Sequence, residues 1–254
     1  MPRLNSLEVL PDSPPFSADL LRSLGLRGIH CGSGQNLRPG WLNTDQSQIK
    51  DRQQQRAESG RLTRFEGKMG SLYYLCHDAT NTYPVDDGTF EWAYSEHFIE
   101  HLEPAAAVAW LADIRRVVEP GGLVRITTPD LRKYVSGYMD PGNRFFAEHW
   151  ERLRPQLEQL LEGAYPSSAD SKQAHHPGGT APPGPAFMVN QIFHCWGHRW
   201  LYDFDELRRV AMLAGFESEA VAEREFNHGR LREVAGLDRE ARSDESIYVE
   251  IERS

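Results

Sequence analysis

The sequence predicts an α/β fold, in which a mostly parallel sheet is covered by helices on both faces. The chain has 254 residues, enough for one well-buried domain with sequence left over for an insertion. Short apolar runs of strand length alternate along it with longer runs of helical periodicity. No internal repeat occurs at a solenoid period. We therefore expect a single domain over residues 1–254, with strands joined by helical crossovers.

Seven strands and five helices account for most of the apolar pattern. The predicted strands lie at 28–31, 41–45, 72–77, 90–95, 123–128, 217–222 and 246–251. Helical periodicity is found at 17–24, 105–118, 144–162 and 203–214, and a further helix begins after Pro129 and Asp130. The second helix ends at a Glu-Pro-Gly-Gly sequence, which is typical of a helix carboxyl terminus.

Two segments interrupt this rhythm. Residues 46–70 are polar, rich in Gln and Arg, and predicted to be a solvated excursion from the sheet. Residues 139–195 combine a helix, a Gly/Pro-rich stretch at 175–185 and several aromatic side chains. Such a segment has little periodicity but more aromatic residues than a linker needs, so we expect a lid that forms a substrate pocket.

Composition and charge disfavour several classes of protein. The net charge is -9, with 28 basic and 37 acidic residues and no Lys/Arg block, so nucleic acid is not the expected partner. No apolar run approaches the ~20 residues that cross a bilayer, and the first 15 residues lack a signal-peptide pattern. The three cysteines are odd in number and far apart, which favours a reduced, cytoplasmic protein.

The strongest chemical signal is a series of residues at the ends of the first three predicted strands. Gly32 and Gly34 follow the first strand, where glycine lets the backbone turn tightly and approach a ligand. Asp45 ends the second strand and Asp78 the third, where they suit a ribose and an adenine amino group respectively. Each residue alone has a plain structural explanation, as a turn, a solvated carboxylate or an N-cap. All three in order predict a nucleoside site at the point where the strand order reverses.

Longer motifs extend this signal to most of 26–135 and 190–254. They are His-Cys-Gly-Ser-Gly at 30–34, Pro-Gly-Trp-Leu-Asn-Thr-Asp at 39–45, Glu-His at 96–97, Glu-His-Leu at 100–102, Val-Val-Glu-Pro-Gly-Gly at 117–122, and Gly-His-Arg-Trp-Leu-Tyr-Asp at 197–203. With these motifs the chain resembles the class I, S-adenosylmethionine-dependent methyltransferases, and most closely a bacterial family of predicted members. The resemblance implies a Rossmann-like class I fold with a seven-stranded, mostly parallel sheet. It also implies that the last strand, 246–251, lies antiparallel between its neighbours. Glu91 departs from the family's usual aspartate, and the segment 46–70 is longer than usual.

The resemblance also implies S-adenosylmethionine as cofactor and a role for each matching residue. Gly32 and Gly34 would face the methionine carboxylate and the ribose, and Asp45 the ribose hydroxyls. Asp78 with Ala79 would meet the adenine. Ser95 and Glu96, at the end of the fourth strand, would line the path to the acceptor. The full expected cofactor set is His30, Gly32, Gly34, Asn36, Trp41, Asp45, Asp78, Ala79, Ser95 and Glu96.

Methyl transfer from a sulfonium needs alignment of donor and acceptor, and a base only if the acceptor must lose a proton. His97 and His101 are four residues apart, as are His194 and His198, so each pair would share a helix face. The candidate bases are His97, His194 and His198, while a structural role is the alternative, favoured for His101. We expect an oxygen or nitrogen atom of a small molecule as acceptor, whose identity the sequence leaves open.

Three other functions compete with this interpretation. Residues 97–101 spell the His-x-x-Glu-His signature of zinc peptidases, but Pro104 follows closely and the motif comes directly after a strand, so no metal site is expected. Leu37 stands where a nicotinamide-binding fingerprint requires a third glycine, which disfavours an oxidoreductase. A protein that binds the cofactor without transferring methyl groups stays open, because binding and chemistry use different residues.

Overall fold

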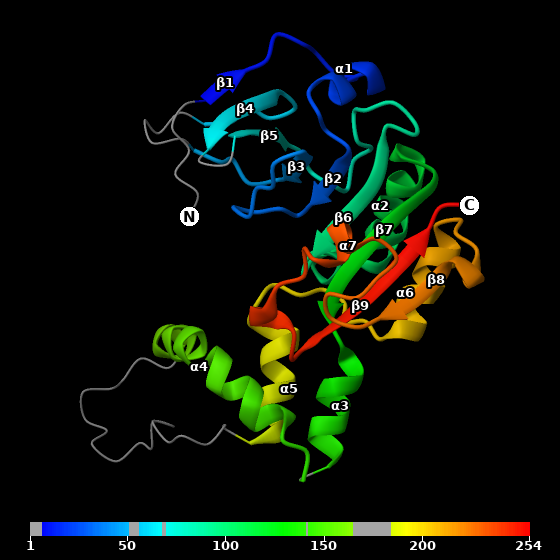
Figure 1. The fold of residues 1–254 in the computed structure, drawn as a ribbon. Coiled ribbons are helices and arrows are strands. Elements are labelled where there is room, and N and C mark those ends of the chain that lie inside the picture. The colour runs from blue at the N-terminus through cyan, green and yellow to red at the C-terminus, as the bar shows by residue number, and fades with distance from the viewer. Residues whose placement is uncertain (1–6, 51–55, 68–69, 141, 165–183) are drawn as a thin grey trace.

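The computed structural model describes residues 7–50, 56–67, 70–140, 142–164 and 184–254, with only the backbone over 156–164. These residues form one sheet in the order β1-β4-β5-β3-β2-β6-β7-β9-β8 (Figure 1). The strands are β1 Leu7–Val9, β2 Gly28–Cys31, β3 Trp41–Asp45, β4 Leu62–Gly67, β5 Gly70–Cys76, β6 Phe90–Glu96, β7 Val118–Pro129, β8 Val221–Arg224 and β9 Ser246–Glu252.

The seven predicted strands are all present, and five of them, β5, β3, β2, β6 and β7, run parallel to one another. β9 lies between β7 and β8 and is antiparallel to both, as predicted. The carboxyl ends of the parallel strands therefore share one edge, and the order reverses between β2 and β6. That reversal is where ligands bind in open α/β sheets.

The prediction of seven strands was wrong, since the described residues form nine. β4 lies within the segment expected to be a solvated excursion and forms an antiparallel hairpin with β5. β1 then pairs with β4 at the sheet edge. Only Leu62 and Phe65 of β4 are large apolar residues, and both are fully buried. Hydrogen bonds to β5, rather than an apolar run, place this strand, so its own sequence carries little signal.

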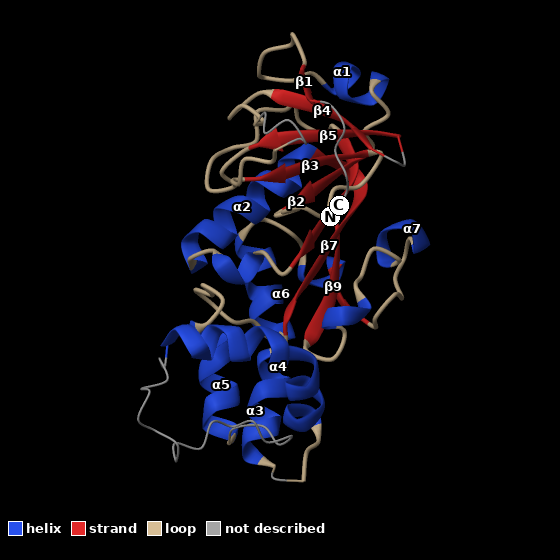
Figure 2. Ribbon diagram, turned by 90° about the vertical axis from the view of Figure 1, so that its left-hand side faces the viewer, coloured by secondary structure: helices blue, strands red, loops and turns tan. Residues whose placement is uncertain are grey.

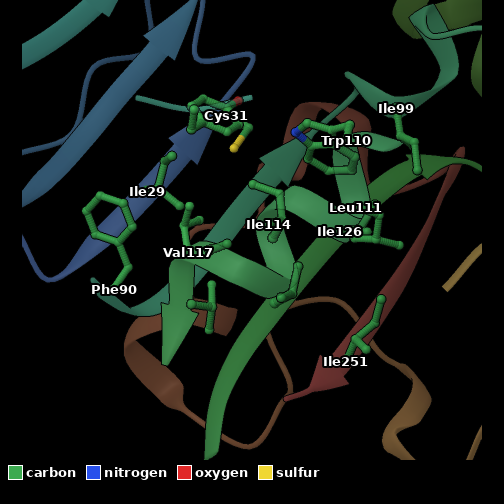
Figure 3. Packing of buried hydrophobic residues seen from close by; sticks show 14 of the residues in the cluster. Ile29, Cys31, Phe90, Ile99, Trp110, Leu111, Ile114, Val117, Ile126 and Ile251 are labelled. Atoms are coloured by element: carbon green, nitrogen blue, oxygen red, sulfur yellow. The ribbon is translucent and has the colours of Figure 1, made fainter. Parts of the chain in front are cut away.

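The helices are α1 Ala18–Ser23, α2 Pro104–Val117, α3 Leu131–Met139, α4 Phe145–Ala164, α5 Pro185–His194, α6 Phe204–Leu213 and α7 Arg232–Ala235. α2 and α6 cover one face of the sheet, and α7 lies on the other (Figure 2). Under α2, apolar side chains of β2, β7 and β9 pack against Trp110, Leu111 and Ile114 in the main core (Figure 3). None of the helices in the described part is long and apolar enough to cross a membrane.

The other face carries a buried polar row. Pairing across adjacent strands aligns Asn43, His30, Tyr94, Arg125 and Glu250. The segment between β8 and β9 covers this row, and its Asp238 accepts hydrogen bonds from Arg125 Nε at 2.8 Å and from Arg125 Nη2 at 2.5 Å. The helical cover predicted for this face is thus mainly an irregular segment held by ionic contacts, with one short helix, α7.

The insertion 139–195 is more regular than predicted. α3, α4 and α5 lie together beyond the carboxyl end of β7 (Figure 1), around a buried cluster of Tyr134, Phe146, Trp150, Met188, Ile192 and Leu201. The sequence analysis missed α5, although Pro185 occupies its first position and Met188 and Ile192, four residues apart, share its buried face. Most of the Gly/Pro-rich stretch at 175–185 lies outside the described residues.

Candidate active site

The turn after β2 is built on two glycines with positive φ, +63° at Gly32 and +51° at Gly34. A Cβ atom on Gly32 would lie 2.4 Å from the Phe98 ring, whereas one on Gly34 would meet nothing within 4 Å. The Asp45 carboxylate holds the turn, because its Oδ2 accepts the Gly34 amide at 3.0 Å. The other oxygen accepts the Ser47 amide at 2.8 Å. The predicted glycines and aspartate are therefore in direct contact at the strand ends.

A cavity of about 490 Å³ opens beside this turn. Its lining residues are His30, Gly32, Ser33, Gly34, Gln35, Asn36, Glu96, His97, Arg239 and Arg242. Five residues of the expected cofactor set, namely His30, Gly32, Gly34, Asn36 and Glu96, thus come together around one space. Burial raises the pKa of Glu96 above its ordinary value, and Arg239 at 3.8 Å opposes that shift.

Two of the buried hydroxyl groups at this edge have no hydrogen-bond partner among the described residues. They belong to Ser33, which lines the cavity, and to Ser95, the residue before Glu96 in β6. Unpartnered buried polar groups are rare in proteins, so they indicate a place where a polar ligand supplies the missing bonds. Together with the open backbone at Gly34, they fit a polar, nucleoside-bearing cofactor.

Asp78 and Ala79 follow β5, two strands away from β2 in the sheet. Asp78 is exposed, and its Oδ1 accepts hydrogen bonds from the amide and hydroxyl of Thr80 at 3.0 and 2.8 Å. These bonds lower the pKa of its carboxyl group. Asp78 thus stabilises a local turn, which was the structural explanation offered by the sequence. Its contact with the adenine of a bound cofactor stays a prediction.

Trp41 contradicts its expected role. It begins β3 and pairs with Gly28, so it lies at the amino ends of the strands, away from the cavity. Its ring is buried 6.0 Å from the Trp92 ring and packs with Tyr94, Leu123 and Val234. Trp41 is therefore a core residue under α7. Only the carboxyl end of β3, at Asp45, reaches the site.

A second cavity of about 810 Å³ adjoins the first, and the two share His97, Arg239 and Arg242. Its remaining lining residues are His101, Arg152, Leu153, Ile192, Trp196, His198, Glu240, Ala241 and Glu245. The insertion contributes Arg152 and Leu153 from α4 and Ile192 from α5.

His97 separates the two cavities but has no free ring nitrogen. Arg242 donates to its Nδ1 at 2.8 Å, and Nε2 lies 2.8 Å from the Ser246 hydroxyl, which itself donates to the Arg242 carbonyl. Burial, followed by the charge of Arg242, lowers the pKa of His97 well below its ordinary value. His97 is thus neutral, and it can accept a proton only if Arg242 moves. It also precedes the 3₁₀ turn Ile99–His101 with φ +47°, so it does not share a helix face with His101 as expected.

His198 and His101 present a different arrangement. His198 donates its Nδ1 hydrogen to the Ile192 carbonyl at 2.6 Å, which leaves Nε2 without a hydrogen-bond partner. His101 likewise donates Nδ1 to the Gly197 carbonyl at 3.3 Å. Burial lowers the pKa of both rings, that of His198 to about 4. His194, by contrast, is exposed at the end of α5 and lines neither cavity. The structure therefore brings together His97 and His198 of the three candidate bases.

Sequence reasoning missed Arg239 and Arg242, which line both cavities. They lie in the irregular segment between β8 and β9, without a motif or periodicity to mark them. Only the folding of this segment over the polar face brings them to the carboxyl ends of β2 and β6.

Residues 29–126 match the family model of a methyltransferase domain. Over these residues, fewer than half of the chain, the sequence is similar to a methyltransferase domain, and the sheet that they build has the order of the Rossmann-like class I fold. The match begins in β2 and ends in β7, so it includes the glycine turn, Asp45, Asp78, Ser95 and Glu96. This match favours a methyltransferase over the nicotinamide oxidoreductase and the zinc hydrolase, and it supports S-adenosylmethionine as the cofactor.

Solved structures of similar fold include a Thermotoga maritima methyltransferase described as a possible histamine N-methyltransferase, with 13% identity, a TM-score of 0.42, and coverage of 92% of this chain and 87% of that one. Another is an S-adenosylmethionine-dependent methyltransferase from Mesorhizobium loti, with 15% identity, a TM-score of 0.42, and coverage of 92% and 96%. A Bordetella parapertussis protein described as possibly exported has 10% identity and a TM-score of 0.41, with 91% of this chain covering 64% of that one. At such scores the likeness does not bear on function. No curated protein matches the sequence.

Proposed function

We propose that this methyltransferase transfers a methyl group from S-adenosylmethionine to an oxygen or nitrogen atom of a small molecule held in the larger cavity. The observation that carries the proposal is that two cavities adjoin each other and share lining residues. One lies at the glycine turn and the other beneath the insertion, and they share His97, Arg239 and Arg242. A transfer reaction requires this arrangement, because donor and acceptor must be aligned within a few ångströms.

The size of the second cavity supports a small-molecule acceptor. About 810 Å³ falls within the ~300–1,000 Å³ typical of ligand pockets. Its walls mix apolar side chains, such as Leu153 and Ile192, with arginines that suit an acceptor bearing a negative or polar group. The insertion 139–195 would act as the lid, since its helices contribute one wall.

The cofactor supplies a methyl group on a positively charged sulfur, which is already activated for displacement. On this proposal the chain's own residues bind and orient. Asp45 accepts the ribose hydroxyls, while the turn at Gly32 and Gly34 faces the methionine part. Ser95 and Glu96 line the path toward the acceptor. A proton lost from the acceptor would pass toward His198 Nε2, the only ring nitrogen among the three predicted bases that is both free and at the larger cavity.

The test is donor binding by calorimetry with the Asp45→Ala variant. We expect its affinity for S-adenosylmethionine to fall roughly 5- to 150-fold, because loss of a carboxylate acceptor costs about 1–3 kcal/mol. Asp45→Asn keeps one acceptor oxygen and should lose less. The matched control is Asp86→Ala, an exposed aspartate that accepts the Ala18 amide far from both cavities. Equal donor affinity in wild type and Asp45→Ala would refute the assignment of that carboxylate.

A further inference from the structure

Beside the larger cavity lies a three-residue cluster, of which the proposed methyl transfer uses only His198. Glu100, His101 and His198 each bring one potential ligand atom to a common point, and these atoms all lie within 4.8 Å of one another. Glu100 and His101 come from the 3₁₀ turn after β6, and His198 from the segment after α5. The cluster therefore joins the sheet edge to the insertion.

Each of the three side chains is oriented by a neighbour in the way metal ligands usually are. Both histidines donate Nδ1 to a backbone carbonyl, at 3.3 Å for His101 and 2.6 Å for His198, so both Nε2 lone pairs are free. Such hydrogen bonds to backbone carbonyls fix the tautomer and ring orientation of metal-bound histidines. The Thr128 hydroxyl donates to one oxygen of Glu100 at 3.0 Å and orients its carboxyl group in turn.

The other carboxyl oxygen of Glu100 is the second, independent observation. The side chain is fully buried, and in the part of the chain that the structure describes its Oε1 has no hydrogen-bond partner. That oxygen lies 4.0 Å from His198 Nε2 and 3.4 Å from His97 Nδ1, but Arg242 already donates to the His97 nitrogen. An unpaired buried carboxylate is costly unless a cation or a hydrogen-bond donor meets it.

The backbone around the cluster is also fixed. The amides of Arg199 and Trp200 both donate to the Glu100 carbonyl, at 2.7 and 3.1 Å. The three side chains therefore come from two segments that are already joined, so metal binding requires only a small movement of the side chains.

We propose that Glu100, His101 and His198 bind a divalent transition-metal ion, for which zinc is the best match. Two histidines and one carboxylate are a common zinc set, with an open position left for water or substrate. Bonds of about 2.0–2.2 Å put tetrahedral ligands roughly 3.4 Å apart, whereas the ligand atoms lie within 4.8 Å of one another, so the cluster has to contract by up to about 1.4 Å on binding. The open side faces the larger cavity, which His101 and His198 line.

This set differs from the zinc peptidase signature at 97–101, because His198 replaces His97 as the second histidine. An ion here would hold an oxygen of the acceptor and make it easier to deprotonate, which gives His198 a ligand's role rather than a base's. The role of the ion in activating the acceptor rests on the proposed function, whereas metal binding itself does not. Arg242 lies nearby and its charge opposes a cation, although Glu245 at 4.0 Å partly offsets it.

The experiment is zinc titration by calorimetry on full-length protein stripped with a chelator, followed by cobalt substitution and visible absorption. We expect one zinc per chain, and a cobalt spectrum typical of tetrahedral coordination. His198→Gln should weaken zinc binding at least about 100-fold, since even loss of an orienting neighbour costs 10–100-fold. Glu100→Gln should do the same, but the residue is buried, so circular dichroism must show that this variant is folded.

The matched control is His194→Gln, which changes an exposed histidine four residues away from His198 and should bind zinc as wild type does. Zinc binding that is absent from wild type, or unchanged in His198→Gln, would overturn the proposal. S-adenosylmethionine affinity measured on the same metal-free samples separates the two ideas. Normal donor binding without any zinc site would reject the metal and leave the methyltransferase assignment intact.

Discussion

Replacing Arg125 with Met should destabilise the protein and detach the segment that carries Arg239 and Arg242. Arg125 is fully buried in β7, on the polar face of the sheet. All five of its N–H groups donate. Two of these bonds, from Nε and Nη2, go to the Asp238 carboxylate, and one from Nη1 goes to Glu250 at 3.0 Å. The last two reach the carbonyls of His228 and Glu225, each at 3.2 Å.

The magnitude follows from what the substitution leaves behind. Asp238 and Glu250 side chains are 0% and 1% exposed, so Met would strand two carboxylates in the interior. Removing one partner of a buried pair typically costs about 3–5 kcal/mol. Glu250 keeps Arg224 at 3.0 Å and Asp238 keeps the Asn227 amide at 2.9 Å, so we expect the lower end, about 3 kcal/mol. For a chain of this size that corresponds to a melting temperature lower by about 6–12 °C.

The assay is guanidinium unfolding followed by tryptophan fluorescence, with donor affinity measured in parallel. Arg132→Met is the matched control, because Arg132 pairs with Glu223 at the surface, where both side chains are nearly half exposed, and should cost under about 1 kcal/mol. Adding Asp238→Leu to Arg125→Met should recover part of the stability, because an apolar pair replaces a stranded charge. Equal unfolding free energies for Arg125→Met and Arg132→Met would show that the buried network does not hold this segment.

Two further predictions concern the cofactor edge. Burial, followed by the charge of Arg38, lowers the pKa of His30 to about 3, below its value of 6.5 in the unfolded chain. As the pH falls, the unfolded chain therefore takes up a proton before the folded one does. The stability present above pH 6.5 is lost as a result. Between pH 7 and pH 5 wild type should lose about 2 kcal/mol more unfolding free energy than His30→Gln, and parallel pH profiles would contradict this. Gly32→Ala should cost about 2–4 kcal/mol, because its Cβ meets Phe98 at positive φ, whereas Gly34→Ala should cost about 1 kcal/mol and mainly weaken donor binding. Chemical denaturation and calorimetry measure both quantities, and equal stability of the two glycine variants would refute the packing argument.

Local patterns in the sequence were sufficient for the central architecture. The core strands β2, β3, β5 and β6 were predicted within two residues, because apolar runs and the turns that end them depend on neighbours in the sequence. β7 was predicted too, but it begins five residues earlier than expected, at Val118. The same applies to α2 and α6, whose apolar spacing and end signals are local. The glycine turn and Asp45 were predicted for the same reason, since strand ends in a parallel sheet meet at one edge.

The elements and residues that the sequence analysis missed or misplaced depend on contacts between residues far apart in the sequence. β4 was missed because pairing with β5 places it, and α5 because the cluster around Trp150 stabilises it. Trp41 was assigned to the cofactor because its motif adjoins Asp45, yet a strand of five residues puts its two ends on opposite edges of the sheet.

The sequence by itself determined the succession of the core strands along the chain and the edge of the sheet at which a cofactor is expected. Only the tertiary structure decided which distant residues complete it. Arg239 and Arg242 reach both cavities because Arg125 and Asp238 hold their segment down. Glu100 meets His198, almost a hundred residues later, because backbone hydrogen bonds join the two segments. Periodicity and turn chemistry act over a few residues, whereas ionic networks and packing join residues that no local pattern relates.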